Sequence, residues 1–301
     1  VFGIMVKAYD RQFDFDWVDA FSQSPFCGNG CAVVYDNGVL SEQSCLNIVR
    51  ETSLVECTFL SSSDIADFRV RYFLSDREIP FAGHPTVATA MSLVSRGKHN
   101  KNKLVFETLA GLINVEVSWS GDQIKISMTQ PKPKFGIKVE KKVLSQIGGI
   151  PENCILCKPQ VVSTGLPFPI VVVDSLETLQ KVTIDYRAFD KFRATISESD
   201  LMEPFWVCLN PIRKNGTTFS RLLLQSSIRG EDPFTGSATG AMAAYLWDNG
   251  LIQNPTFTAH QGDFLGRPGE AEVEVLGPAG NISGVKVTGS AYILMTGKLK
   301  I

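Results

Sequence analysis

Apolar residues in this chain gather mostly in short runs that are typical of β-strands. Strands are predicted at 55–60 and 68–74, which are rich in apolar and aromatic residues, and at 112–119, where apolar and polar residues alternate. Helical spacing is most marked at 85–95 and 238–248, two alanine-rich segments that predict helices enclosed on most sides. Many strands with one conspicuous helix in each half predict an α+β fold.

Both helical segments belong to a repeated stretch. Residues 78–97 and 231–250 lie 153 positions apart and are identical at nine of twenty aligned positions without a gap. In each copy an apolar strand leads through a Pro-Phe-x-Gly turn into the helix. Because the offset is about half of the 301 residues, we expect two pseudo-symmetric domains that face each other across a cleft.

The Pro- and Lys-rich stretch 130–138 is the predicted linker, because nothing in it can sustain a helix or a central strand. The predicted domains are therefore residues 1–129 and 130–301. The C-terminal strand 293–301 is a candidate to complete the sheet of the first domain.

The starts of the two repeated helices predict an anion site. Pro85 suits the first helical position and places His84 at the N-cap, and Ser237 is the predicted N-cap of the second helix. Backbone N–H groups at Gly83 and Gly236 would then point out of two helix N-termini, which attract anions. Two such helix ends together predict a binding site for a carboxylate group. The alternative is that these turns only cap two buried helices.

Composition narrows the class of protein. With 33.0 kDa, 44% hydrophobic and 20% charged residues, the sequence is that of an ordinary globular chain of about two domains. A net charge of −2 gives no reason to expect binding to nucleic acid or to a membrane surface. No apolar stretch is as long as a membrane span and no signal-peptide pattern opens the chain, so a cytoplasmic protein is expected.

Metal and cofactor sites are not indicated. Seven cysteines without regular spacing predict reduced thiols, and the single C-x-x-C at 154–157 with three histidines in the chain gives little support to a zinc site. The glycine-rich motifs for dinucleotides and for ATP are missing from the sequence. Chemistry is therefore expected from side chains.

Glu56, in the string SLVECTFL, is the candidate acid–base group. On a strand its carboxyl would project from an otherwise apolar surface, where burial raises the pKa. A carboxyl with a raised pKa can act as an acid and then as a base near neutrality. The alternative is a strand glutamate that faces solvent.

Five ordered motifs resemble the phenazine biosynthesis PhzF-like family, and they cover the chain from about Trp17 onward. They read VDAFSQSPFCGNGCAVV, SLVECTF, DFRVRYFLSDREIPFAGHPTVATA, EDPFTGSATGAMAAYL and QGDFLGRPGEAEVEV. The resemblance implies the diaminopimelate epimerase-like fold, in which each domain is a barrel-like, mostly antiparallel sheet around a central helix. It also implies no cofactor, and a homodimer.

The resemblance further implies a function and a set of site residues. Glu56 falls at the glutamate that moves a proton between carbons of the substrate, so the expected protein is a cofactor-independent isomerase of a small cyclic carboxylate. Gly83 and Gly236 would receive the carboxylate through their backbone, and Gly262 and Arg267 would close the anion site. The implied substrate-binding residues are His84, Asp232, Ser237, Gly83, Gly236, Gly262 and Arg267.

Some positions depart from the family pattern. Gly30 stands where the family usually has proline, and Thr239 stands where a histidine is common, which leaves the substrate open. Residues 9–15, before the first strand expected for the family, are extra and are expected to be an extension.

Two other functions fit the same fold. In amino-acid epimerases and racemases two opposed cysteines would occupy the positions of Ala82 and Thr235, so that the sequence disfavours a two-thiol enzyme. Cys57 follows Glu56 on the same strand and is expected to point into the core. A non-catalytic protein that binds small carboxylates is the other alternative, although an ionised Glu56 would hinder anion binding.

Overall fold

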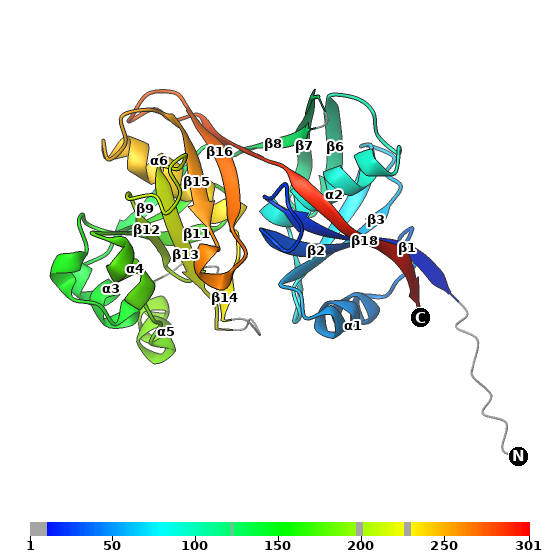
Figure 1. Cartoon of the computed structure of the whole chain (residues 1–301). Coiled ribbons are helices and arrows are strands. Elements are labelled where there is room, and N and C mark those ends of the chain that lie inside the picture. Colours follow the sequence, from blue (N-terminus) through cyan, green and yellow to red (C-terminus); the bar gives the residue numbers. More distant parts are fainter. Residues whose placement is uncertain (1–10, 122, 197–200, 226–229) are drawn as a thin grey trace, which may run out of the picture.

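The computed structural model describes residues 11–121, 123–196, 201–225 and 230–301. These residues form two lobes, and in each lobe a mostly antiparallel sheet wraps around one central helix, α2 or α6 (Figure 1). The expected α+β fold with two pseudo-symmetric domains is confirmed. The boundary between residues 129 and 130 stays a prediction.

The first lobe contains two helices and eight strands within the described residues. Helix α1 begins after Ser41, whose hydroxyl accepts a hydrogen bond from the backbone N–H of Ser44, as an N-cap does. The elements are β1 (Gln12–Ala20), β2 (Asn29–Tyr35), α1 (Glu42–Thr52), β3 (Glu56–Ser61), β4 (Phe68–Phe73), β5 (Glu78–Ile79), α2 (Gly83–Ser95), β6 (Lys103–Thr108), β7 (Gly111–Ser120) and β8 (Gln123–Gln130).

The second lobe repeats this plan and adds a small helical layer (α3, α4 and α5) that packs over one sheet face. The sequence of residues 185–200 favours a helix, and the structure has α5 there, ending at Ala194; residues 197–200 lie outside the described residues. The elements are β9 (Lys134–Lys138), α3 (Lys141–Gly148), β10 (Gln160–Ser163), β11 (Pro167–Val173), α4 (Leu176–Lys181), α5 (Tyr186–Ala194), β12 (Phe205–Cys208), β13 (Thr218–Leu223), β14 (Glu231–Asp232), α6 (Gly236–Asp248), β15 (Thr256–Gln261), β16 (Gly269–Leu276), β17 (Gly284–Gly289) and β18 (Ala291–Lys300), with short 3₁₀ turns at Glu152–Cys154 and Asp263–Leu265.

Two strands join the lobes. β8 pairs with β7 in the first lobe and with β17 in the second, and β18 leaves the second lobe to pair with β1 along its whole length (Figure 1). The C-terminal strand thus completes the sheet of the first lobe. A stacked aromatic pair, Phe21 and Phe234, adds a contact between the lobes, with ring centroids 4.3 Å apart.

Two local predictions are corrected. Residues 134–138 were expected to lie in a linker, yet they form β9, which pairs with β10 and with no other strand of the described residues. Prolines are tolerated beside such an edge strand because its outer N–H groups need no partner in the sheet. Residues 9–15 were expected to be an extension, but β1 begins at Gln12 and the Phe13 ring is 7% exposed in the core. Residues 9 and 10 lie outside the described residues.

The two halves also repeat a salt bridge that fixes the turn before each central helix. Arg71 binds both carboxylate oxygens of Glu78 at 3.0 and 2.7 Å, and Arg221 binds Glu231 at the same two distances. In each case the arginine lies on the strand that pairs with the glutamate's own short strand. The first residue of each repeated stretch is thus anchored before the chain turns into the helix.

Candidate active site

The N-terminal ends of α2 and α6 meet where the lobes touch. A Cβ atom on Gly83 would lie 3.2 Å from the backbone nitrogen of Ser237 and 3.4 Å from the Cα of Gly236. Such contacts are tighter than ordinary packing, so a glycine lets the two helix ends approach this closely. Within the described residues, no acceptor is found for the backbone N–H groups of Gly83, His84, Gly236 or Ser237. The predicted convergence of the two helix ends is confirmed.

The predicted helix caps are wrong by two residues. α2 begins at Gly83 with Ala82 at the N-cap, and α6 begins at Gly236 with Thr235 at the N-cap. His84 and Ser237 are therefore inside the first turn, and neither N-cap residue provides a side-chain bond to the helix. Threonines four residues later secure each first turn instead by donating back to the cap carbonyls: Thr86 to Ala82 at 2.7 Å and Thr239 to Thr235 at 2.9 Å.

Glu56 is the first residue of β3, and its side chain is 16% exposed. Its Oε2 atom lies 3.6 Å from Nδ1 of His84 and makes no hydrogen bond with any described residue. The pKa of Glu56 is raised to about 8, mainly by burial and in addition by the nearby Asp232 carboxyl. The protonated and the ionised form are therefore both accessible near neutral pH. Cys57, the next residue, is fully buried in the core as expected.

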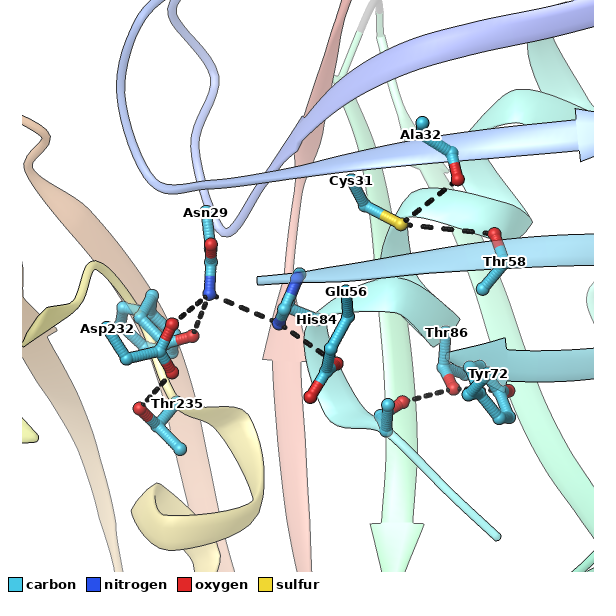
Figure 2. Close-up of polar contacts among 12 residues, drawn as sticks. Asn29, Cys31, Ala32, Glu56, Thr58, Tyr72, His84, Thr86, Asp232 and Thr235 are labelled. Carbon is cyan, nitrogen blue, oxygen red and sulfur yellow. Dashed lines mark hydrogen bonds and ion pairs between the residues drawn. The ribbon is translucent and has the colours of Figure 1, made fainter. Parts of the chain in front are cut away.

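His84 is a neutral group behind Glu56. Its side chain is 4% exposed, and burial lowers its pKa to about 3. The Nδ2 atom of Asn29 lies 3.1 Å from the Nδ1 atom of His84, within hydrogen-bond distance. His84 therefore contributes a dipole rather than a charge to the site (Figure 2).

Asp232 brings a second carboxyl from the other lobe. Its Oδ1 accepts from Asn29 Nδ2 at 2.6 Å, and its Oδ2 accepts from the Thr235 hydroxyl at 2.5 Å. Burial raises the pKa of Asp232 to about 7, although these two hydrogen bonds oppose the shift. Two carboxyl groups, one from each lobe, thus titrate near neutrality in one cleft (Figure 2).

Asn29 links the lobes and was not among the predicted site residues. Besides its contacts with His84 and Asp232, its Nδ2 donates to the backbone carbonyl of Phe234 at 2.9 Å. The only feature of the sequence that could have identified Asn29 as a site residue is its position between Gly28 and Gly30. At Gly30 a Cβ would lie 3.1 Å from Leu54, so the glycine that replaces the family's usual proline also makes room for a neighbouring side chain.

A cleft of about 930 Å³ opens beside this cluster and is lined by both lobes. Of the predicted site residues, Glu56, Asp232 and Ser237 line it, together with Asn29 and Thr235. Gly83, His84 and Gly236 lie behind these residues, and Gly262 and Arg267 are not part of the lining. The structure therefore brings together the core of the predicted site and leaves two of its members outside.

Arg267 was expected to close the anion site, but its guanidinium binds protein groups instead. It donates to the fully buried carboxylate of Asp19 at 2.7 Å and to the backbone carbonyls of Gly28 and Cys27 at 2.9 and 3.2 Å. Gly262 has φ of 90°, and a Cβ there would lie 2.3 Å from the carbonyl of Arg267 and 2.5 Å from that of Pro233. Arg267 therefore holds the loop before Asn29 against the second lobe, and Gly262 lets the backbone at Arg267 and Pro233 approach closely.

Other kinds of site find little support in the part of the chain that the structure describes. No cysteine is among the residues that line the cleft, and Ala82 and Thr235 precede the two helix glycines where a two-thiol enzyme needs cysteines. No group of three or more His, Cys, Asp or Glu residues with a metal-binding arrangement occurs among the described residues. None of the described helices is both long and apolar enough to cross a membrane.

Comparisons with known proteins show which family the chain resembles in sequence and in fold. The chain is 31% identical to an uncharacterized isomerase of Escherichia coli K12, YddE, over 92% of this chain and 95% of that protein. It is 30% identical to the trans-2,3-dihydro-3-hydroxyanthranilate isomerase of Pseudomonas chlororaphis, over 94% and 97% respectively.

Among solved structures, a PhzF-family phenazine biosynthesis protein from Bacillus anthracis matches with a TM-score of 0.85 and 24% identity, over 97% of this chain and all of that one. A hydroxyproline epimerase from Agrobacterium vitis shares the fold, with a TM-score of 0.67 and 13% identity over 98% and 94% of the two chains. The profile of the phenazine biosynthesis-like proteins, PhzC-PhzF, matches residues 18–297. The chain therefore belongs to the PhzC-PhzF family of phenazine biosynthesis-like proteins and is an isomerase.

Proposed function

We propose that this protein moves a proton between two carbons of a small cyclic carboxylate, with Glu56 as the single acid–base group and without a cofactor. The carboxylate of the substrate accepts hydrogen bonds from backbone N–H groups at the N-terminal end of α6, beside Ser237. The reacting carbons lie next to Glu56. Asp232 polarises the substrate from the second lobe, and His84 acts from behind Glu56 in the first lobe.

One observation carries the proposal: a carboxyl with a pKa of about 8 lies in a cleft beside two helix ends that meet. A general acid–base group is most effective when its pKa is near the working pH. The carboxylate form of Glu56 can take a proton from one carbon, and the resulting acid can return a proton to another carbon while the double bond shifts. The overall reaction consumes no proton and needs no second reactant.

The Pseudomonas relative suggests the first substrate to test. It is named for trans-2,3-dihydro-3-hydroxyanthranilate, a cyclic diene acid, which fits the proposed chemistry. While Glu56 holds the transferred proton, its carboxyl group can exchange that proton with solvent. In D₂O the product should therefore carry deuterium at carbon, which NMR detects.

The matched variants are Glu56→Gln and Glu51→Gln. Glu56→Gln keeps the shape of the side chain but removes its proton chemistry, so turnover should fall by at least about 10²-fold. Glu51 is an exposed residue near the end of α1, and its variant should keep wild-type turnover. Unchanged turnover in Glu56→Gln would remove this residue from the mechanism. Product without deuterium at carbon would contradict proton exchange through the side chain.

A further inference from the structure

The cleft is much larger than a single-ring acid requires. Its volume is about 930 Å³. If each non-hydrogen atom of a ligand takes roughly the 30 Å³ of a water molecule, the cleft has space for about 30 such atoms. A cyclic diene acid with about ten non-hydrogen atoms would fill about a third of it. The remainder of the cleft therefore has a lining that the proposed reaction does not use.

Part of that lining is apolar on both lobes, beside charged residues that include Arg50, Glu78 and Glu203. Ile79 contributes from β5 in the first lobe, and Leu166, Met202 and Leu224 contribute from the second. All four are only partly buried, and all four pack with their inner sides against the main core, so their positions are fixed. Apolar side chains that remain exposed inside a cleft favour an apolar ligand, because each contact removes apolar surface from water.

The apolar wall continues directly from the catalytic cluster. Leu222 on β13 pairs with Asp232, and Leu224 follows two residues later on the same side of the chain. The backbone N–H of Met202 donates to the carbonyl of Pro167 at 2.9 Å, which brings Met202 beside Leu166. The charged side chains of Arg77 and Arg193, 61% and 45% exposed, mark the solvent end of the cleft.

We infer that the substrate of this enzyme carries an apolar group of about one additional ring beyond its reacting carbons, and that Ile79, Leu166, Met202 and Leu224 bind this group. The inference rests on the proposed function, because it places the carboxylate at the end of α6. The four residues then select among ring acids by the size and polarity of what is attached to the ring, while Glu56 performs the same proton transfer.

Direct binding tests this inference without turnover. Benzoate serves as the single-ring acid, and biphenyl-3-carboxylate and biphenyl-4-carboxylate carry one more ring; isophthalate and terephthalate carry a second carboxylate at the same positions. Calorimetric titration of the wild-type protein at pH 7 should show at least one biphenyl acid binding at least about 10-fold more tightly than benzoate, the gain expected when a ring is buried. Equal or weaker binding of both biphenyl acids overturns the inference, and so does a gain found only for the dicarboxylates.

Variants locate the additional ring. Met202→Gln and Leu224→Asn replace apolar groups by polar ones of similar size, and each should reduce the biphenyl gain to within about 3-fold of benzoate while benzoate affinity stays unchanged. Leu156→Asn is the matched control, because Leu156 is 52% exposed and is not part of the cleft lining. A biphenyl gain that survives in both cleft variants overturns the assignment to this wall.

Carboxamides distinguish this inference from the proposed function. If biphenyl carboxamides bind as tightly as the acids and the cleft variants still weaken them, the apolar site stands and the carboxylate site at α6 is wrong. If the acids bind at least about 10-fold more tightly than the amides, both stand. If none of these compounds binds, the inference is overturned, while the deuterium assay still tests the proton transfer separately.

Discussion

The raised pKa of Glu56 predicts a pH-dependent loss of stability that can be measured without any substrate. The carboxyl has an ordinary pKa of 4.5 and a pKa of about 8 in the folded protein. The folded state therefore binds this proton more tightly than the unfolded chain does. The resulting stabilisation is complete below about pH 4.5 and is lost as the pH rises through about 8.

The magnitude follows from the two pKa values. Linkage between proton binding and folding gives a loss of about 3 kcal/mol in the free energy of unfolding between pH 5 and pH 8. The side chain is 16% exposed, so solvent screens this effect only weakly. Glu56→Gln stays neutral at every pH and lacks this loss. Its stability relative to the wild-type protein should therefore rise by about 3 kcal/mol from pH 5 to pH 8.

Urea unfolding followed by tryptophan fluorescence at pH 5, 6, 7 and 8 measures this difference. Asp232 also titrates in this range, but it is present in both proteins and its effect largely cancels in the comparison. Glu51→Gln, the exposed control, should follow the wild-type protein at every pH. If the curves of Glu56→Gln and the wild-type protein run parallel, the carboxyl is not buried in the way that the acid–base role requires.

Two further variants test how the lobes are held together. Gly83→Ala places a Cβ 3.2 Å from the backbone nitrogen of Ser237, so it should lower the free energy of unfolding by about 1–3 kcal/mol and weaken benzoate binding; unchanged values of both would show that the helix ends have room to spare. Arg267→Met leaves the buried carboxylate of Asp19 without its cation and should lower the free energy of unfolding by about 3 kcal/mol, measured in urea, with benzoate affinity unchanged within about 3-fold. Loss of benzoate binding with unchanged stability would instead restore Arg267 to the anion site.

The local parts of the fold and site were predictable from the sequence. The repeated stretch predicted two helices whose ends converge, because strand, turn and helix are encoded within a few residues, although both N-caps lie two residues earlier than predicted. The apolar neighbours of Glu56 likewise predicted a carboxyl in a surrounding that raises its pKa. Each of these inferences depended on a short segment, and the structure confirmed them.

What the sequence did not reveal depends on contacts between distant residues. Asn29 donates to groups 203 and 205 residues away, and nothing near it in the chain identifies these partners. Arg267 could not be told from an anion ligand until Asp19, 248 residues away, was found to bind it. Residues 134–138 form an edge strand because β10 is available to pair with them, which their own composition does not indicate. The homodimer and the cytoplasmic location stay predictions.

The pairing of β1 with β18 has a consequence for how the protein is made. Gln12 pairs with Lys300, so β1 is synthesised long before the strand that becomes its partner. Until then one edge of β1 has no partner, and an open strand edge is a template for wrong pairing with other chains. A polypeptide released before residue 291 cannot close the first lobe. The first lobe is therefore closed only after β18 has been synthesised.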